Sequence, residues 1–390
     1  MNKALTALAI GGFGIGLTEF VIMGILPEVA EGLSISIPKA GHFIAAYAIG
    51  VVVGAPTLTA LGNRWPANRV LLILMGWFTL FNSLSALAWN YESMLTLRFL
   101  SGLPHGAYFG IGAVVATSQV RESRAASAIA MLFVGFTLAN VIGVPTATYV
   151  GQQLSWGSSF LIVGAVGVIA IIAIFAWVPH LKPSSASGLM ADLRILKNPE
   201  IWMVILLCII GSGSFFAWYS YISPVITDVA GHPKFMVSVA MTLAGVGMAI
   251  GNFLGAKLAE KFSPLRAIMI ILFSITFLFL ANSFFAAHKI MVLVLTFCIG
   301  TAAFSMSSPI QLTMIQTARN SETLGASINQ SAFNIGNAMG AYVAGIPIAL
   351  GFGFTSADWV AAGLSATGLL VGFGIFSLRK YRKVSVQTPD

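Results

Sequence analysis

The sequence predicts an all-α membrane protein with twelve transmembrane helices in two six-helix pseudo-repeat bundles. Hydrophobic residues make up 57% of the 390 residues and charged residues only 8%, and mean hydropathy is +0.91. Soluble domains are about one quarter charged. Twelve segments also reach the ~20 apolar residues that a bilayer core of about 30 Å requires. Finally, the first six segments resemble the last six at a constant offset.

The twelve predicted spans are divided by a single long connection. In order, they cover residues 4–29, 38–61, 69–89, 93–119, 125–151, 157–179, 200–226, 235–258, 265–287, 290–315, 323–350 and 356–378. The connection contains serine, proline and lysine. We therefore predict a bundle over 1–179, a cytoplasmic linker over 180–199, a second bundle over 200–380 and a cytoplasmic tail over 381–390. The first apolar run continues past signal-peptide length, so we interpret it as an uncleaved helix.

The lysines and arginines predict the orientation of the chain. Of the 20, sixteen fall at the N-terminus, in the even-numbered loops and at the C-terminus, whereas the other side holds Lys39, Lys234 and Lys289. Cytoplasmic loops carry the excess of positive charge, so both termini are expected in the cytoplasm. Because the charge of +8 is spread over loops, it does not indicate nucleic-acid binding.

The two halves match at an offset of 197 residues without a gap. The matched pairs are Pro27 and Pro224, Gly50 and Gly247, Gly54 and Gly251, Arg64 and Lys261, Arg69 and Arg266, Asn140 and Asn337, and Gly143 and Gly340. Parallel repeats of this kind place a binding site near the bilayer midplane, between the halves.

Three stretches are similar to a known family: Thr18–Ala30, Ser36–Pro56 and Arg98–Ala116. On these, the chain resembles major facilitator superfamily transporters of the twelve-span drug–proton antiporter group, and within it the arabinose-efflux-permease-like bacterial proteins. The resemblance covers nearly all of residues 1–380. It implies the major facilitator fold and transport by alternating access.

Several motifs carry this resemblance. Arg98 followed by spaced glycines resembles the fourth-helix motif, whose arginine is linked to proton transfer in the family. Gly143 and Pro145 resemble the fifth-helix antiporter motif. The loop between spans 2 and 3 departs from the family, because Asn63 replaces the usual aspartate, which puts a salt-bridged cytoplasmic latch there in doubt. The residues expected to serve conformational change are Gly54, Asn63, Arg64, Arg69, Gly143, Pro145, Glu260, Lys261 and Arg266.

Glu19, Arg98 and His105 are the candidates for proton coupling. Glu19 is the only acid that the sequence places near the middle of a span, and intramembrane acids mark functional sites by default. The alternatives are a structural ion pair between Glu19 and Arg98, or cation-substrate binding by Glu19 alone. Arg98 can instead snorkel to the outer end of its helix. His105 can titrate or only donate a hydrogen bond across the bundle.

A second set of residues is expected to line a substrate cavity with aromatic rings and amides. Its members are Phe13, Phe20, Tyr108, Phe216, Tyr219, Gln330, Asn334 and Asn337. Three of the amides fall at i, i+4 and i+7 and so share one helical stripe. For any single member the alternative is a lipid-facing aromatic ring or an interhelical amide bond, because buried amides need partners.

Together these features predict a proton-coupled efflux antiporter of small amphipathic compounds or sugars. The alternative is a sugar or metabolite exporter or facilitator without tight proton coupling. No nucleophile–base pair, HExxH motif or phosphate-binding loop is recognisable, so we do not expect an enzyme. We expect no cofactor or metal, only a proton gradient as energy source. The expected partners are lipid, protons and a small-molecule substrate, with the protein a monomer in a bacterial inner membrane.

Overall fold

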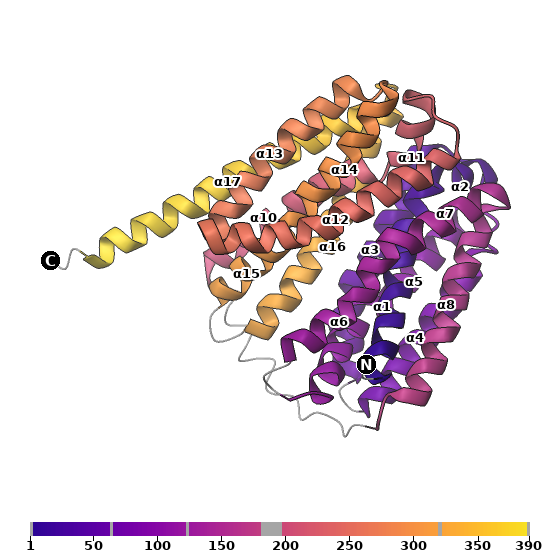
Figure 1. The fold of residues 1–390 in the computed structure, drawn as a ribbon, viewed down its shortest axis with the longest axis horizontal. Coiled ribbons are helices and arrows are strands. Elements are labelled where there is room, and N and C mark those ends of the chain that lie inside the picture. Colours follow the sequence, from indigo (N-terminus) through magenta and orange to yellow (C-terminus); the bar gives the residue numbers. More distant parts are fainter. Residues whose placement is uncertain (1–2, 63–64, 122–124, 181–196, 319–321, 388–390) are drawn as a thin grey trace.

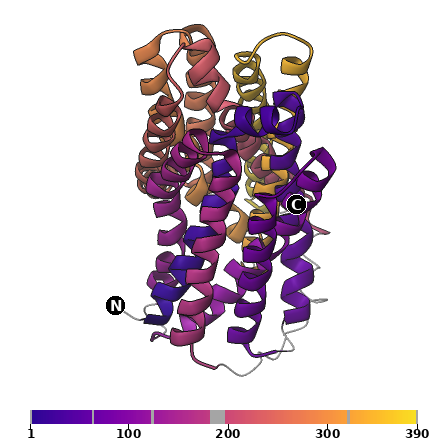
Figure 2. The ribbon, with the colours of Figure 1, turned by 90° about the vertical axis from the view of Figure 1, so that its right-hand side faces the viewer.

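The computed structural model describes residues 3–62, 65–121, 125–180, 197–318 and 322–387, and this part of the chain contains helices and no strand. The helices form two groups (Figure 1), the first coloured indigo to magenta and the second pink to yellow. The groups converge near α2, α7 and α11 and separate toward the ends of α6 and α15. Within the first group the long helices run side by side along a common direction (Figure 2).

Each predicted span coincides with one helix or with two or three consecutive helical segments. The first half contains α1 (Lys3–Gly24), α2 (Leu26–Gly32), α3 (Ile37–Gly62), α4 (Ala67–Ser85), α5 (Tyr91–Ser118), α6 (Ala125–Leu138), η2 (Ala139–Gly143), α7 (Val144–Gln153) and α8 (Trp156–Trp177). The second half contains α10 (Pro199–Tyr219), α11 (Ile222–Pro224), η4 (Val225–Val229), α12 (Phe235–Phe262), α13 (Pro264–Phe285), α14 (Lys289–Ser305), α15 (Ser307–Ala318), α16 (Glu322–Ala349) and α17 (Ser356–Gln387).

Eleven segments of the described chain are long and apolar enough to cross a membrane. Helix α16, which coincides with the eleventh predicted span (323–350), is not among them, although it has 28 residues. Its sequence explains this, since it carries the amides Asn329, Gln330, Asn334 and Asn337. Helix α17 continues to Gln387, so the predicted tail begins as a helical extension.

Four spans that the sequence predicts as continuous are interrupted, each beside a proline. Span 1 breaks before Pro27 and span 7 before Pro224. In span 5 the π-helical segment η2 directly precedes the turn with Pro145, and span 10 breaks just before Pro309. Proline lacks a backbone donor and clashes with the preceding turn, so it interrupts a helix and is tolerated at the start of the next one.

The repeat extends to helix packing. In the first half, Gly50 and Gly54 of α3 lie against α5, and a Cβ atom on Gly54 would be 2.0 Å from the Leu103 carbonyl oxygen. In the second half, Gly247 and Gly251 of α12 lie against α14, where a Cβ on Gly251 would be 2.2 Å from the Thr301 oxygen. Small residues allow this close approach of two backbones.

The two halves meet through α3 against α16, and through α12 against α7 and η2. We call the end of the bundle that carries Lys39, Lys234 and Lys289 the low-charge end. There, Lys234 Nζ of the second half lies 3.4 Å from Glu28 Oε1 of the first. The rings of His42 and Tyr342 also lie 5.5 Å apart across the junction. The structure is therefore closed between the halves at the low-charge end.

Candidate functional site

A buried polar cluster occupies the interior of the first half, where α1, α3, α4 and α5 pack together. Its members are Thr18, Glu19, Tyr47, Asn82, Arg98 and His105, and all are almost completely buried. Apolar residues surround them, so these groups must satisfy one another. The cluster is therefore the chemically distinctive part of the membrane interior.

Arg98 is held entirely inside the protein. Its two terminal nitrogens donate to the hydroxyl and the carbonyl oxygen of Thr18, at 2.9 and 3.1 Å. The guanidinium lies over the rings of Tyr47 and Phe160, with centroids 4.5 and 5.5 Å away. The side chain does not snorkel to an end of the helix, because its exposed fraction is 0%. Two aromatic faces and two hydrogen bonds stabilise the buried cation.

Two further polar contacts complete the cluster. The Thr18 hydroxyl also bonds to Asn82 Oδ1, which fixes α1 against α4. The Tyr47 hydroxyl lies 3.1 Å from His105 Nδ1, while His105 Nε2 has no partner in the part of the chain that the structure describes. His105 is thereby connected to Arg98 through the Tyr47 side chain.

Glu19 points toward the other half of the protein. Its Oε1 accepts a hydrogen bond from Asn337 Nδ2 at 3.2 Å, between residues separated by 318 positions in the chain. Glu19 and Arg98, both within the described chain, do not form an ion pair with each other. The predicted alternative of a structural Glu19–Arg98 pair is therefore wrong for this structure. The acid lies at the junction of the halves, away from lipid and bulk water.

The five aromatic residues predicted to line the cavity lie in three places. Phe20, Phe216 and Tyr219 form an aromatic junction between the halves, with Phe20 5.9 Å from Phe216 and 5.8 Å from Tyr219. Tyr108 lies within the first half instead, where its hydroxyl donates to the Leu8 carbonyl at 2.9 Å. Half-buried Phe13 lies beside Gly143.

The amide stripe of α16 is not uniform. Asn337 donates through Nδ2 to Glu19 of the other half, whereas Asn334 donates through Nδ2 to the backbone oxygen of Gln330 at 3.0 Å. The Oδ1 atom of Asn334 is buried and has no partner among the described residues. Gln330 is half-buried. Within the described chain, Asn334 and Gln330 do not bond to the other half, so these two members of the stripe remain as polar candidates for a ligand.

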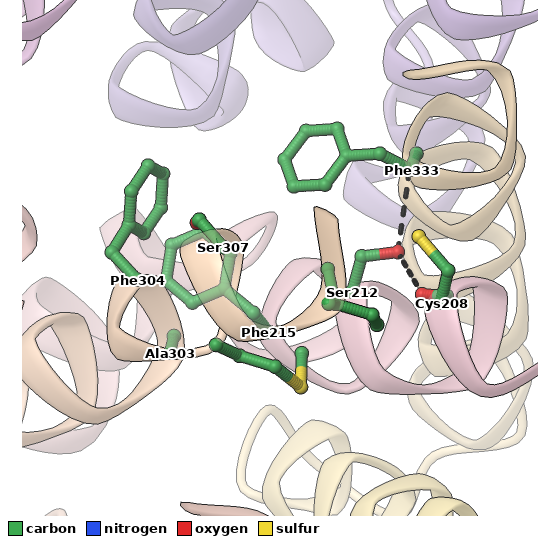
Figure 3. Close-up of a pocket in the computed structure, with 9 residues that line it drawn as sticks. Cys208, Ser212, Phe215, Ala303, Phe304, Ser307 and Phe333 are labelled. Carbon is green, nitrogen blue, oxygen red and sulfur yellow. Dashed lines mark hydrogen bonds between the residues drawn. The ribbon is translucent and has the colours of Figure 1, made fainter. Parts of the chain in front are cut away.

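A small apolar pocket opens beside this stripe in the second half (Figure 3). It is lined by Cys208, Ser212, Phe215, Ala303, Phe304, Met306, Ser307, Ile310 and Phe333. The rings of Phe304 and Phe333 project on the same side of it, with Ser307 between them. Ser212 is already bonded to the carbonyl oxygens of Cys208 and Phe333, at 2.7 and 3.3 Å. The pocket thus offers aromatic faces and few free polar groups.

The predicted latch residues are only partly described. Asn63 and Arg64 lie outside the described residues. Arg69, Glu260, Lys261 and Arg266 are exposed, and the guanidinium of Arg266 lies 5.7 Å from the Phe376 ring centroid. At the same end, Arg379 Nε pairs with Glu200 Oε1 at 2.7 Å within the second half.

Sequence reasoning missed several members of the buried cluster. Thr18, Tyr47 and Asn82 were not predicted, and neither was Phe160, whose ring faces Arg98, because each is an unremarkable residue of an apolar helix. A second buried acid was also missed: Asp358 of α17 accepts a hydrogen bond from Asn282 of α13 at 2.9 Å. Asp358 lies in the first turn of its helix, where an exposed acid is common, so the sequence did not mark it as buried.

Two similar helical halves that meet at a buried acid define a class, the secondary membrane transporters built from parallel repeats. Comparison with known proteins identifies the family within that class. The model of the Major Facilitator Superfamily matches residues 8–341, and the chain belongs to this family. The protein is therefore a membrane transporter.

Relatives support the same assignment along the whole chain. It is 40% identical over 379 residues to "Inner membrane transport protein YdhP" of Escherichia coli K12, covering 96% of each chain. It is 34% identical over 391 residues to "Putative transporter AraJ" of the same strain, covering 100% of this chain and 98% of that one. A "Chloramphenicol resistance protein" of Streptomyces lividans is 27% identical over 380 residues, with 96% of each covered.

The solved structures show the same fold at low identity. The crystal structure of a mutant form of the nucleoside transporter NupG is similar, with a TM-score of 0.76 and 12% sequence identity. The match covers 96% of this chain and all of the NupG chain. At that identity the likeness concerns only the fold, which is the major facilitator fold.

Proposed function

We propose that this protein is a proton-coupled efflux antiporter of small amphipathic compounds. It would act by alternating access in a bacterial inner membrane, with both termini in the cytoplasm. The observation that carries the proposal is Glu19, a fully buried carboxyl group at the junction of two halves that must separate and rejoin. Buried intramembrane acids of this kind mark ion and proton pathways.

The surroundings of Glu19 support proton exchange over a static role. A static buried acid is best stabilised by an ion pair, yet Glu19 and Arg98 remain unpaired with each other in this structure. Arg98 instead has its own partners on Thr18, Tyr47 and Phe160. In the closed state Arg98 therefore does not form an ion pair with Glu19. A bound proton can neutralise the Glu19 carboxylate instead.

The substrate class follows from the surfaces between the halves. The junction presents the rings of Phe20, Phe216 and Tyr219, and the adjoining pocket adds Phe304 and Phe333. Ligand sites that are mostly apolar, with few polar groups, favour compounds with rings or alkyl groups. The name of the relative from Streptomyces lividans, a chloramphenicol resistance protein, points in the same direction.

One observation favours the second candidate, a sugar or metabolite exporter without tight proton coupling. The buried Oδ1 atom of Asn334 has no partner within the described chain, and Gln330 lies one helical turn away. Side-chain amides oriented this way can bond sugar hydroxyls. A thermal-shift panel of drugs and sugars on the purified protein separates the two substrate classes.

Transport into proteoliposomes, with and without an imposed pH gradient, tests the coupling. We expect the gradient to drive uptake by the wild type, and we expect Glu19→Gln to lose gradient-driven uptake while downhill exchange continues. The matched control is Asp358→Asn, which changes the other buried acid, located within the second half. If the wild-type rate ignores the gradient, the antiporter proposal fails and the exporter alternative replaces it.

A further inference from the structure

Two buried acids of this protein share the same unfinished arrangement with an asparagine. Glu19 Oε1 accepts from Asn337 Nδ2, while Glu19 Oε2 and Asn337 Oδ1 are buried without a partner in the described chain. Asp358 Oδ1 accepts from Asn282 Nδ2, while Asp358 Oδ2 and Asn282 Oδ1 are likewise unpartnered among the described residues. The Glu19 pair joins the two halves, whereas the Asp358 pair joins α13 and α17 of the same half.

The chemistry of these groups explains what completes each pair. A carboxamide presents one accepting oxygen and one donating nitrogen, whereas an ionised carboxylate only accepts. An ionised acid can therefore make one bond to the amide, and neither its second oxygen nor the amide oxygen can supply the hydrogen for another. A protonated acid donates from its second oxygen and makes both bonds at once.

We propose that Glu19 and Asn337 form a proton-dependent clasp between the two halves of the transporter. When a proton from water binds Glu19, the Oε2 hydroxyl donates to Asn337 Oδ1 beside the existing bond from Asn337 Nδ2 to Oε1. Release of the proton to water removes the second bond and weakens the contact. The inference rests on the proposed function in one respect, that Glu19 exchanges protons during the cycle.

The groups around Glu19 determine which half stabilises its carboxylate once the proton has left. From α5 and α3, Arg98 and Tyr47 interact electrostatically with it, and His105 lies behind Tyr47. From α10, Tyr219 packs on the neighbouring Phe20. The Arg98 Nε atom is buried and has no partner within the described chain. The ionised acid thus has a cation in its own half, and only the neutral acid bonds fully across the junction.

The clasp has a definite direction in the transport cycle. The structure is closed between the halves at the low-charge end, and the Glu19–Asn337 bond is present in this state. Protonation therefore favours closure of the low-charge end. In an antiporter the proton-loaded, substrate-free carrier must make this closing step, so the clasp accelerates the return after substrate release.

A distance measurement across the low-charge end tests the clasp without any substrate or gradient. Spin labels go on Trp89→Cys and Phe352→Cys, whose native side chains are 78% and 72% exposed and belong to different halves. The background carries C208A and C298A. Because one net hydrogen bond changes a population by about twofold to tenfold, we expect the short-distance population to rise by that factor from mildly alkaline to mildly acidic buffer.

Three variants decide the outcome. Asn337→Leu should lose the pH response, and Asn282→Leu, the matched change in the other pair, should keep it. Glu19→Gln should show a high short-distance population in both buffers, because a glutamine amide offers both bonds without titrating. Because it keeps Asn337, this variant tests the clasp even if Asn337→Leu does not fold. A normal response in Asn337→Leu or in Glu19→Gln overturns the clasp. Absence of gradient-driven transport in a wild type that still shows the distance response overturns the antiporter proposal instead.

Discussion

The two halves of this transporter share their packing but differ in their buried chemistry. The polar cluster of the first half consists of Thr18, Glu19, Tyr47, Asn82, Arg98 and His105. The residues 197 positions later are, in the same order, Phe215, Phe216, Ala244, Phe279, Leu295 and Ala302. Each polar member of the cluster thus corresponds to an apolar residue. The glycine contacts between α3 and α5, in contrast, recur between α12 and α14.

This difference shows which features of a repeat are constrained by packing. Close contact of two helix backbones depends on small residues at fixed spacing, so both halves keep those positions. A buried cation is costly in a membrane and needs a dedicated set of partners; among the described residues, the one fully buried cation is Arg98, in the first half. Under the proposed function, the first half would handle protons and the second half would bind the apolar groups of the substrate.

The largest expected effect is on Arg98. Arg98→Met removes two charge-assisted hydrogen bonds to Thr18, each worth about 1.5–3 kcal/mol. We expect gradient-driven transport in proteoliposomes to fall by about 100-fold, which corresponds to roughly 3 kcal/mol. The matched change in the second half, Leu295→Met, should leave the rate nearly unchanged. Equal losses in the two variants would remove the division of roles between the halves.

The next largest effect concerns the packing that the halves share. Gly54→Ala and Gly251→Ala place a methyl group 2.0 and 2.2 Å from a backbone oxygen of the facing helix. Overpacking of this kind costs about 1–3 kcal/mol, so both should lower the thermal midpoint of the purified protein to a similar extent. Gly76→Ala, where no atom lies within 4 Å, is the control and should not lower it. A loss confined to one half would show that the packing is not equivalent.

A smaller effect is expected for the aromatic lining. Phe333 packs on Phe216 at 5.3 Å and lines the pocket, and its counterpart in the first half is Phe136, which packs on Phe20 at 5.8 Å. An aromatic contact is worth about 0.5–1.5 kcal/mol. Phe333→Ala should therefore raise the KM of an amphipathic substrate about threefold to tenfold without changing its dependence on the pH gradient. A larger rise in Phe136→Ala would assign substrate binding to the first half.

The smallest effect is expected at the ion pair between Lys234 and Glu28. The Lys234 side chain is 60% exposed, so water and salt screen the interaction, and such pairs contribute about 0.2–1 kcal/mol. Lys234→Met should shift the distance distribution at the low-charge end slightly toward separation, and added salt should produce the same shift in the wild type. Lys289→Met at the same end is the control. A full opening in Lys234→Met would make this pair, and not the buried junction, the main closure.

The positions of the spans could be predicted from sequence because they depend on hydropathy alone. Each of the twelve predicted segments coincides with helix, and the 197-residue offset located the glycines that pack α3 on α5 and α12 on α14. The helix breaks beside Pro27, Pro145, Pro224 and Pro309 were not predicted as breaks, because a membrane-spanning helix can also tolerate proline with only a kink.

The site was predictable only in part. Glu19 and Arg98 stand out in sequence because ionisable residues are rare in apolar spans, and the structure buries both. Their partners were not predictable. Asn337 was expected among the substrate-binding amides and instead bonds to Glu19, and Arg98 bonds to Thr18 rather than to the acid.

The sequence by itself therefore determined which segments enter the membrane, how the two halves correspond and that Glu19 lies inside an apolar span. The spans and the burial of Glu19 follow from the partition of side chains between water and hydrocarbon, which is a property of local composition. The correspondence of the halves follows from residues repeated at a constant offset. The tertiary structure decided which buried groups meet. A contact between α1 and α16 depends on the depth and rotation of two helices 318 positions apart in the chain, and only the packing of all the helices determines that geometry.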